Sequence, residues 1–265
     1  MAPLSFFDPF FIRLSGGSRR DLARCMTPSL PVDQHTTAPS VTVLAPAYNE
    51  EQVIESFVVN VARVLQPGWE LLIVDDGSTD RTGELLRGVG PTPGLRVVTH
   101  ARNQGMGAAL RTGFSNATGD IVITVDADLS HPLELIPALV SAASTSDVVF
   151  ASRYVRGGGM LDVPWHRAAI SRVANAVLRR LLRIPVRDLT TGFRAYRRSA
   201  LTGIRLEGTG FETQLELTVK LARSTATMTE VPMLLRKRMA GTSKMRYTRL
   251  AGGYGRMVLR LMLRR

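Results

Sequence analysis

The chain has 265 residues, of which 45% are hydrophobic, and it carries a formal net charge of +12. This length and apolar content suffice to bury a core, so they exclude disorder over most of the chain and predict one large domain or two small ones. A single cysteine, Cys25, excludes an intramolecular disulfide framework and a cysteine-rich zinc site. The basic excess indicates an anionic partner: nucleic acid, a membrane surface or a phosphorylated substrate.

The first 40 residues have no periodic pattern and contain an aromatic cluster near their start. We expect residues 1–40 to form a flexible leader, either a disordered tail or a segment whose apolar tip touches lipid. The sequence has no run of about 18 or more apolar residues, which is the length needed to cross a bilayer. We therefore expect no transmembrane helix and only peripheral contact with a membrane.

Short apolar runs alternate with helical patterns in the next part of the chain. Strands are expected at 41–45, 71–74, 96–99, 121–125 and 148–151, and helices at 51–65, 107–116 and 133–143. This alternation predicts an α/β fold with a mostly parallel sheet that is covered by helices on both faces. Ligands of such open sheets bind beyond the carboxyl ends of the strands, so functional residues are expected there.

The pattern changes after Gly157. A basic amphipathic helix is expected over 166–184, with apolar residues along one side and arginines supplying charge. We expect a loop at 188–196, a helix at 211–222 and an extended segment at 227–235. A basic amphipathic helix of this kind is typical of proteins that lie on a membrane surface.

The tail, residues 246–265, is both basic and apolar. On a helix, its apolar residues Leu250, Tyr254, Met257 and Leu261 fall on one face and its arginines on another. Two interpretations stay open for this tail: a helix in the headgroup region of a membrane, and a helix that packs on the core.

Two carboxylates follow the expected strand at 121–125, in the segment DADLS. Asp126 and Asp128 are two residues apart, so both reach one cation if the chain turns there. Oxygen ligands select hard cations such as Mg²⁺ or Mn²⁺, and substrate phosphates complete the shell when the protein supplies few ligands. A pair of solvated loop aspartates is the alternative, since this short pattern also occurs by chance.

Polar residues also end the two preceding strands of the expected sheet. Asn49 and Glu50 follow the first strand, and Asp75 and Asp76 follow the second. Three polar clusters at the same edge favour a binding site, in which Asp76 could accept hydrogen bonds from ribose hydroxyls. Ser78 and Asp80, in the turn DDGSTD, are interpreted as turn and helix-cap residues instead. His131 is interpreted as shaping a turn, not as a catalytic base.

These segments, taken in order, resemble family-2 glycosyltransferases with the GT-A fold. The matching motifs are PAYNE (46–50), DDGSTD (75–80), RNQGMGAALRTG (102–113), DADLSHP (126–132) and SRY (152–154). Later motifs are similar to those of dolichyl- and polyprenyl-phosphate mannosyltransferases: SRYVRGGG (152–159), TTGFRAYRR (190–198), GFETQLEL (210–217) and RMAGTSKM (238–245). The resemblance implies a Rossmann-like GT-A domain over residues 41–245.

The resemblance also implies roles for individual residues. It puts five around the nucleoside: Pro46, Tyr48, Glu50, Val74 and Asp76. It puts four at the diphosphate and its metal: Asp126, Ala127, Asp128 and Ser130, with Asp126, Asp128 and Ser130 as metal ligands. The basic residues that meet phosphates are Arg153, Arg238 and Lys244, and Arg167 faces the acceptor. Asp128, Arg153 and Arg167 would be the catalytic residues.

The resulting hypothesis is an inverting, metal-dependent mannosyltransferase. It would move mannose from GDP-mannose to a dolichyl or polyprenyl phosphate, with Mg²⁺ or Mn²⁺, as a cytoplasmic enzyme peripheral on the cytosolic face of a membrane. The nearest alternative is the same reaction with UDP-glucose or another UDP-hexose. A basic nucleic-acid-binding protein is a remote alternative, because the chain has no recognised nucleic-acid motif and its arginines accompany the phosphate-site motifs.

Overall fold

The computed structural model describes residues 38–90, 92–238 and 247–263. The described residues from Pro39 onward belong to one compact unit. Most of the expected leader, residues 1–37, lies outside the described residues. Within the described part of the chain, no helix is long and apolar enough to cross a membrane.

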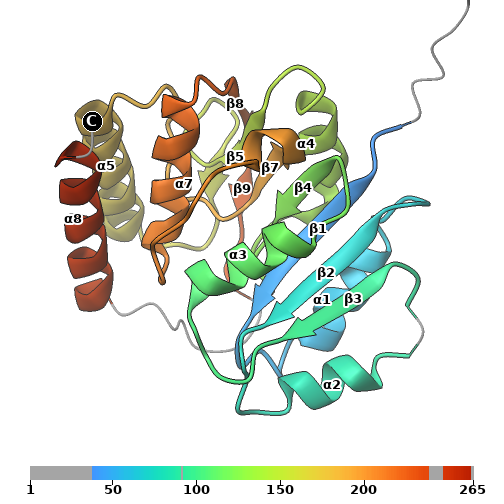
Figure 1. Ribbon diagram of the computed structural model, residues 1–265. Coiled ribbons are helices and arrows are strands. Elements are labelled where there is room, and N and C mark those ends of the chain that lie inside the picture. Colours follow the sequence, from blue (N-terminus) through green and yellow to red (C-terminus); the bar gives the residue numbers. More distant parts are fainter. Residues whose placement is uncertain (1–37, 91, 239–246, 264–265) are drawn as a thin grey trace, which may run out of the picture. The chain divides into compact units, whose positions relative to one another are not determined.

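A seven-stranded sheet forms the centre of this unit (Figure 1). Its strands, in spatial order, are β3 (Leu95–Thr99), β2 (Glu70–Asp75), β1 (Val41–Ala47), β4 (Ile121–Thr124), β7 (Arg194–Arg197), β5 (Val148–Ser152) and β8 (Met228–Pro232). All neighbours pair in parallel except β7, which is antiparallel to both β4 and β5. Two short strands, β6 (Gly159–Met160) and β9 (Leu234–Leu235), pair separately. The α/β fold with a mostly parallel sheet is therefore confirmed.

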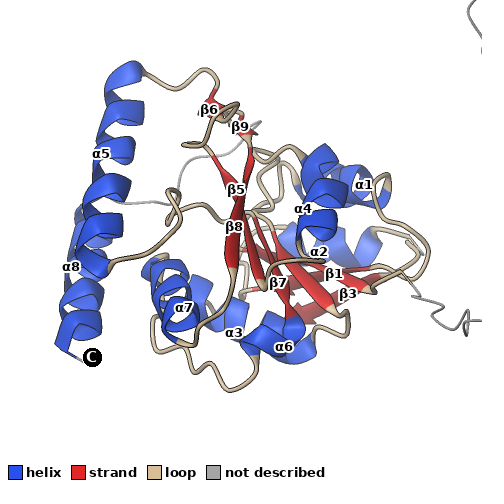
Figure 2. Cartoon of the chain, turned by 90° about the horizontal axis from the view of Figure 1, so that it is seen from above, coloured by secondary structure: helices blue, strands red, loops and turns tan. Residues whose placement is uncertain are grey.

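Helices cover both faces of the sheet (Figure 2). One face carries α1 (Ile54–Ala62), α2 (Thr82–Gly88), the short 3-10 turn Leu133–Leu135 and α4 (Ile136–Ala142). The other carries α3 (Met106–Asn116), α6 (Arg198–Leu201) and α7 (Glu212–Arg223), with α5 (Trp165–Leu182) and α8 (Tyr247–Leu263) outside α7. Side chains of β1 alternate between the two cores: Val43 and Ala45 pack toward α1, whereas Leu44 packs toward α3.

The expected loop at 188–196 is partly wrong, because its end forms β7. Residues 194–197 lie between β4 and β5 and pair with both. Ala195 and Tyr196 are buried, and the side chain of Arg194 is also fully buried. The sheet thus receives its antiparallel strand from a segment with charged residues at both ends, which is why the sequence pattern did not indicate a strand.

Residues 247–263 of the tail form α8, and its apolar residues Met257 and Leu261 pack on the core. Met257 and Leu261 are buried in the same cluster as Leu215 of α7. Arg223 of α7 donates a hydrogen bond to the carbonyl of Leu261. For these residues, the core-packing interpretation of the tail is the one that the structure supports.

The carboxylate of Glu70 joins β2 to three neighbouring segments. It accepts hydrogen bonds from Thr42 Oγ1 at 2.6 Å, Thr118 Oγ1 at 2.7 Å and Arg96 Nη1 at 2.7 Å. Burial acts to raise its pKa, but the hydrogen bonds outweigh burial and lower the pKa of Glu70 from 4.5 to about 2. Because the pKa is lower in the folded state, the carboxylate stabilises the fold above pH 4.5, and this contribution is lost as the pH falls toward 2.

A Glu70→Gln variant is expected to lower the free energy of unfolding by about 2 kcal/mol at pH 7, because it removes a charged acceptor from these bonds. Urea unfolding at several pH values measures this difference, which should shrink as the pH approaches 2. Glu84→Gln is the matched control, since Glu84 is an exposed residue of α2 that pairs with Arg81. A difference that does not depend on pH would contradict the assigned role of the Glu70 charge.

Candidate active site

Asp126 and Asp128 lie just beyond the carboxyl end of β4, where the chain turns. Leu129 adopts the left-handed conformation, with φ of 59°. This turn lets the backbone N–H of Ser130 donate to Asp128 Oδ1 at 2.9 Å. Asp128 is buried, while the side chain of Asp126 is partly exposed. The two carboxylates are therefore held at the same strand end, as expected, and Ala127 between them is buried.

Arg238 brings the ends of β1 and β4 together. Its Nη2 atom lies 2.8 Å from Asp128 Oδ2, and its Nη1 atom lies 3.6 Å from Glu50 Oε1. Arg238 follows β9, far along the chain from both carboxylates. The structure thus unites Glu50, Asp128 and Arg238, three residues that the sequence assigned to the donor site.

The two aspartates have opposite pKa shifts. The side chain of Asp126 keeps 34% of its surface exposed, but loss of hydration over the rest raises the pKa of Asp126 above its ordinary range, and the neighbouring charge of Asp128 acts in the same direction. Burial also acts to raise the pKa of Asp128, but the hydrogen bonds from Ser130 and the charge of Arg238 hold that pKa below its ordinary range. Asp128 is accordingly the carboxylate that keeps its negative charge most firmly.

His131 packs beneath this turn and holds its backbone. Its ring is buried and stacks on Phe193 with centroids 5.2 Å apart. Its Nδ1 atom accepts a hydrogen bond from the backbone N–H of Asp126 at 3.2 Å. This contact agrees with the interpretation of His131 as a residue that shapes the turn.

Asp76 supports the loop that precedes α3. Its Oδ1 atom accepts the N–H of Gln104 at 3.0 Å and lies 2.6 Å from His100 Nδ1, while its Oδ2 atom accepts the N–H of Gly105 at 2.7 Å. Both carboxylate oxygens are therefore engaged within the protein. A ribose contact by Asp76 stays a prediction, and such a contact would have to share these oxygens.

Hydrogen bonds connect the loops that follow β1 and β2. Ser78 Oγ accepts the N–H of Asn49 at 2.9 Å, and Thr82 Oγ1 accepts the N–H of Glu50 at 2.7 Å. Asp80 accepts the N–H of Thr82, the first residue of α2, at 2.9 Å. The remaining expected nucleoside residues, Pro46, Tyr48 and Val74, lie at these same two strand ends.

Arg153 forms an ion pair with Asp188 and not with the carboxylates that follow β4. Its Nε and Nη2 atoms donate to the two oxygens of Asp188 at 2.7 and 2.6 Å, and Nη2 also donates to Thr190 Oγ1 at 2.8 Å. Asn175 of α5 accepts the N–H of Leu189 at 2.8 Å, so the same loop is joined to α5. In this arrangement, the fork that was expected to bind phosphate is used to fix the 188–190 loop.

Arg167 lies in the first turn of α5, and its side chain is exposed. Nearby on the same helix, Ser171 Oγ lies 2.7 Å from the hydroxyl oxygen of Tyr154, which follows β5. The structure thus places α5 beside the end of β5, and among the described residues Arg167 makes no ion pair with the two carboxylates. Lys244 lies outside the described residues.

The two carboxylates fit a cation whose remaining ligands would come from the substrate. Among the residues that the structure describes, no three His, Cys, Asp or Glu side chains converge into a metal site. Asp126 and Asp128 supply carboxylate oxygens from one turn, and Mg²⁺ sites built from one or two carboxylates are completed by water and phosphate oxygens. Ser130 hydrogen-bonds Asp128, so its own role as a metal ligand stays a prediction.

The chain matches the model of Glycosyl transferase family 2 over residues 42–204. The chain belongs to this family. It is therefore a glycosyltransferase, and the matched span contains the ends of β1, β2, β4 and β5 together with β7. Arg238 lies beyond the matched span.

Curated relatives of this glycosyltransferase include enzymes named for polyprenyl-linked sugars. It is 35% identical over 212 residues to the polyprenol monophosphomannose synthase of Mycolicibacterium smegmatis, covering 77% of this chain and 80% of that protein. It is 34% identical to the dolichol-phosphate mannosyltransferase of Pyrococcus furiosus, over 78% of this chain and 59% of that protein. The chain thus spans less than two thirds of the length of the Pyrococcus relative.

The glycosyltransferase also shares its fold with solved structures. Glucosyl-3-phosphoglycerate synthase from Mycobacterium tuberculosis, solved in complex with Mn²⁺, UDP and phosphoglyceric acid, superposes with a TM-score of 0.64 at 23% identity. The match covers 85% of this chain and 78% of that one. At this identity the similarity establishes the fold alone.

Sequence reasoning assigned no role to three residues near the site: Asp188, Arg194 and Gln214. Arg194 and Gln214 lie inside the motifs TTGFRAYRR and GFETQLEL, which carried the resemblance. The motifs were therefore a usable signal for those two, whereas Asp188 lay in the expected loop. Its pairing with Arg153 bridges 35 positions of the chain and has no local signature.

Proposed function

We propose that this glycosyltransferase transfers mannose from GDP-mannose to a dolichyl or polyprenyl phosphate, with Mg²⁺ or Mn²⁺ and with inversion at the anomeric carbon. The observation that carries the proposal is the cluster of Glu50, Asp128 and Arg238 at the carboxyl edge of the sheet. It occurs in a chain that is 35% identical to a polyprenol monophosphomannose synthase.

The chemistry follows from the charges of the reactants. An oxygen of the acceptor phosphate forms a bond to the anomeric carbon as the bond from that carbon to the nucleoside diphosphate breaks, so direct displacement inverts the centre. A phosphate monoester with a second pKa near ~6 is mostly dianionic at neutral pH, so it needs no separate base. Asp126 and Asp128 would hold a divalent cation, which would supply positive charge for the diphosphate leaving group. Arg238 would bind phosphate oxygens through its planar fork.

The same reaction with UDP-glucose or another UDP-hexose is the second candidate. It stays a candidate because nothing in the described residues selects between a guanine and a uracil base in the donor. The two candidates differ in the base and sugar of the donor and share every other step.

A donor screen tests both candidates. Purified protein with Mn²⁺ or Mg²⁺ and a short polyprenyl phosphate is incubated with GDP-mannose, UDP-glucose or UDP-N-acetylglucosamine, and glycolipid is detected by mass spectrometry. The expected result is a mannosyl polyprenyl phosphate that forms from GDP-mannose only when the metal is present. Glycolipid from a UDP-hexose alone would favour the second candidate, and no glycolipid from any donor would contradict both.

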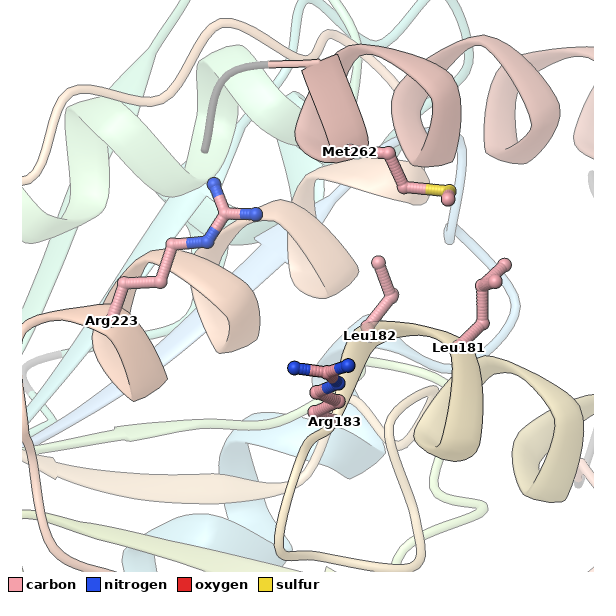
Figure 3. A pocket seen from close by; sticks show the side chains of 5 residues that line it. All are labelled: Leu181, Leu182, Arg183, Arg223 and Met262. Atoms are coloured by element: carbon pink, nitrogen blue, oxygen red, sulfur yellow. The ribbon is translucent and has the colours of Figure 1, made fainter.

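The outer face of α5 supports a position on the surface of a membrane, which we propose to be the cytosolic one. Asn175 faces inward and is only 1% exposed, whereas Ile170 and Val173 are 68% and 62% exposed. Beside the C-terminal end of α5, a cavity of about 260 Å³ opens between α5 and α8 (Figure 3). Its lining combines apolar and basic side chains: Leu181, Leu182, Arg183, Arg223 and Met262. Exposed apolar residues beside arginines suit the headgroup region of an anionic bilayer.

Replacing Val173 and Val177 together by serine is expected to weaken binding to phosphatidylglycerol vesicles by about tenfold, since it removes exposed apolar surface from α5. Co-sedimentation with the vesicles measures the bound fraction. Val59→Ser is the matched control, because Val59 is also an exposed valine but lies on α1, on the other face of the sheet. Equal binding by the double variant and this control would contradict the proposed contact.

A further inference from the structure

The order of the strands sets out the donor site along one edge of the sheet. The residues assigned to the nucleoside end β1 and β2, the two carboxylates follow β4, and β7 is the next strand along. If the proposed function holds, a donor whose nucleoside lies at β1 and β2 and whose diphosphate lies at β4 carries its hexose toward the start of β7 (Figure 1). The residues at that point are therefore candidates for contact with the sugar.

Three groups converge at the start of β7. A Cβ atom on Gly192 would lie 2.9 Å from Asp126 Oδ1 and 3.2 Å from Gln214 Nε2, so Gly192 approaches both side chains closely. The hydroxyl of Thr124, at the end of β4, donates to the carbonyl of Gly192 at 2.7 Å. The close approach of Gly192 thus brings the first carboxylate and the amide of Gln214 to the same point beside the start of β7.

Arg194 fixes the backbone that carries Gln214. The guanidinium is fully buried, and its Nη1 atom donates to the carbonyl of Gln214 at 3.0 Å and to Thr218 Oγ1 at 2.8 Å. Its Nη2 atom donates to the carbonyl of Leu189 at 2.7 Å. These bonds hold the first turn of α7 against β7 and the segment before it. The side chain of Gln214 is therefore presented from a rigid position.

The amide of Gln214 has unused hydrogen-bonding capacity. Gln214 is only 7% exposed, and its Oε1 atom is buried without a hydrogen-bond partner among the residues that the structure describes. Buried polar side-chain atoms in proteins are nearly always paired, so an unpaired amide oxygen next to a binding site indicates a ligand group that pairs with it. The side-chain amide of glutamine has one group that donates hydrogen bonds and one that accepts them, and a rotation of 180° exchanges their positions. Sugar hydroxyls also both donate and accept, so such an amide suits them.

We propose that Gln214 hydrogen-bonds a hydroxyl of the donor hexose and helps to select which hexose is transferred. The inference rests on the proposed function and adds a residue that contacts the sugar and contributes to specificity for the donor. A site that hydrogen-bonds a substrate hydroxyl discriminates strongly against an analogue that cannot make the bond, because the protein group is then left unpaired. Gln214 would thus distinguish epimers that share the same nucleoside diphosphate.

Binding measurements on the full chain test this inference without any acceptor. The dissociation constants of GDP, GDP-mannose and GDP-glucose are measured by calorimetry with Mn²⁺, for the unchanged chain and for Gln214→Leu. The variant should change the ratio between the two sugar nucleotides by about tenfold. Its affinity for GDP should stay within about twofold of the unchanged chain, because GDP carries no sugar.

Two further variants complete the design. Thr213→Val is the matched control, because Thr213 is buried in the same turn of α7 but its hydroxyl faces Gly107 and Gly208. The ratio of the dissociation constants of GDP-mannose and GDP-glucose should not change in this variant. If Gln214→Leu does not fold, Gln214→Glu replaces it, since the carboxylate keeps the shape and loses the donor. An unchanged ratio, or equal loss of affinity for GDP and both sugar nucleotides, would overturn the inference. If Gln214→Leu changes the ratio as expected but the donor screen gives no glycolipid, the result counts against the proposed acceptor alone.

Discussion

An Asp128→Asn variant is expected to fold normally and to transfer sugar about 1,000-fold more slowly than the unchanged chain. Asparagine has the shape of aspartate and can still accept the N–H of Ser130, so the turn after β4 should persist. It lacks the negative charge that faces Arg238 and that would hold a divalent cation. Because that cation would offset the charge that develops on the diphosphate, the loss should appear in the rate of the chemical step.

Initial rates of glycolipid formation measure this effect, and circular dichroism with thermal unfolding checks the fold. Asp147→Asn is the matched control. Asp147 precedes β5 and therefore lies at the amino edge of the sheet, where it accepts hydrogen bonds from Thr227. We expect this control to transfer sugar at the rate of the unchanged chain. A rate for Asp128→Asn within a factor of about ten of the unchanged chain would refute the role assigned to this carboxylate.

An Asp188→Ala variant is expected to lower the free energy of unfolding by about 3–5 kcal/mol. Asp188 is fully buried, and the side chain of Arg153 that it pairs with is only 11% exposed. Burial alone acts to lower the pKa of Arg153, but the hydrogen bonds and charge of Asp188 raise that pKa above its ordinary value. Removal of Asp188 would therefore leave a charged guanidinium buried without its partner.

Chemical denaturation of four proteins isolates this pair: the unchanged chain, Asp188→Ala, Arg153→Met, and the double variant. The double variant should be more stable than the two single losses predict when added together, because it contains no unpaired buried charge. Additive losses would mean that the two side chains do not interact in solution. Urea midpoints and slopes provide the free energies.

The sequence was informative where structure is local. The strands at β1, β2, β4 and β5 follow continuous apolar runs, and the parallel sheet follows from their alternation with helices. β7 was missed because its two buried apolar residues, Ala195 and Tyr196, are too few to form a pattern, and both of its partners are distant in sequence. For α5 the helix was predicted correctly, but a polar residue, Asn175, faces inward, which the apolar pattern of the sequence did not indicate.

The site divides in the same way. Asp126, Asp128 and Glu50 were found because each follows a strand, and strand ends are visible in the sequence. The ion pair of Arg238 with Asp128 and that of Arg153 with Asp188 are set by the folded topology, so no local pattern reveals them. The hydrogen bonds that Asp76 accepts from the backbone N–H groups of Gln104 and Gly105 are also set by the folded topology.

The position of β7 has a consequence for how the protein is made. A ribosome releases β1, β2, β3 and β4 first, and in the finished sheet β4 has β1 on one side and β7 on the other. Until residues 194–197 have been synthesised, the strand that leads to Asp126 and Asp128 has one edge without its partner. Open strand edges pair readily with other chains. Nascent chains that stop between β5 and β7 should therefore aggregate, and chains that extend past Arg197 should be far less prone to do so.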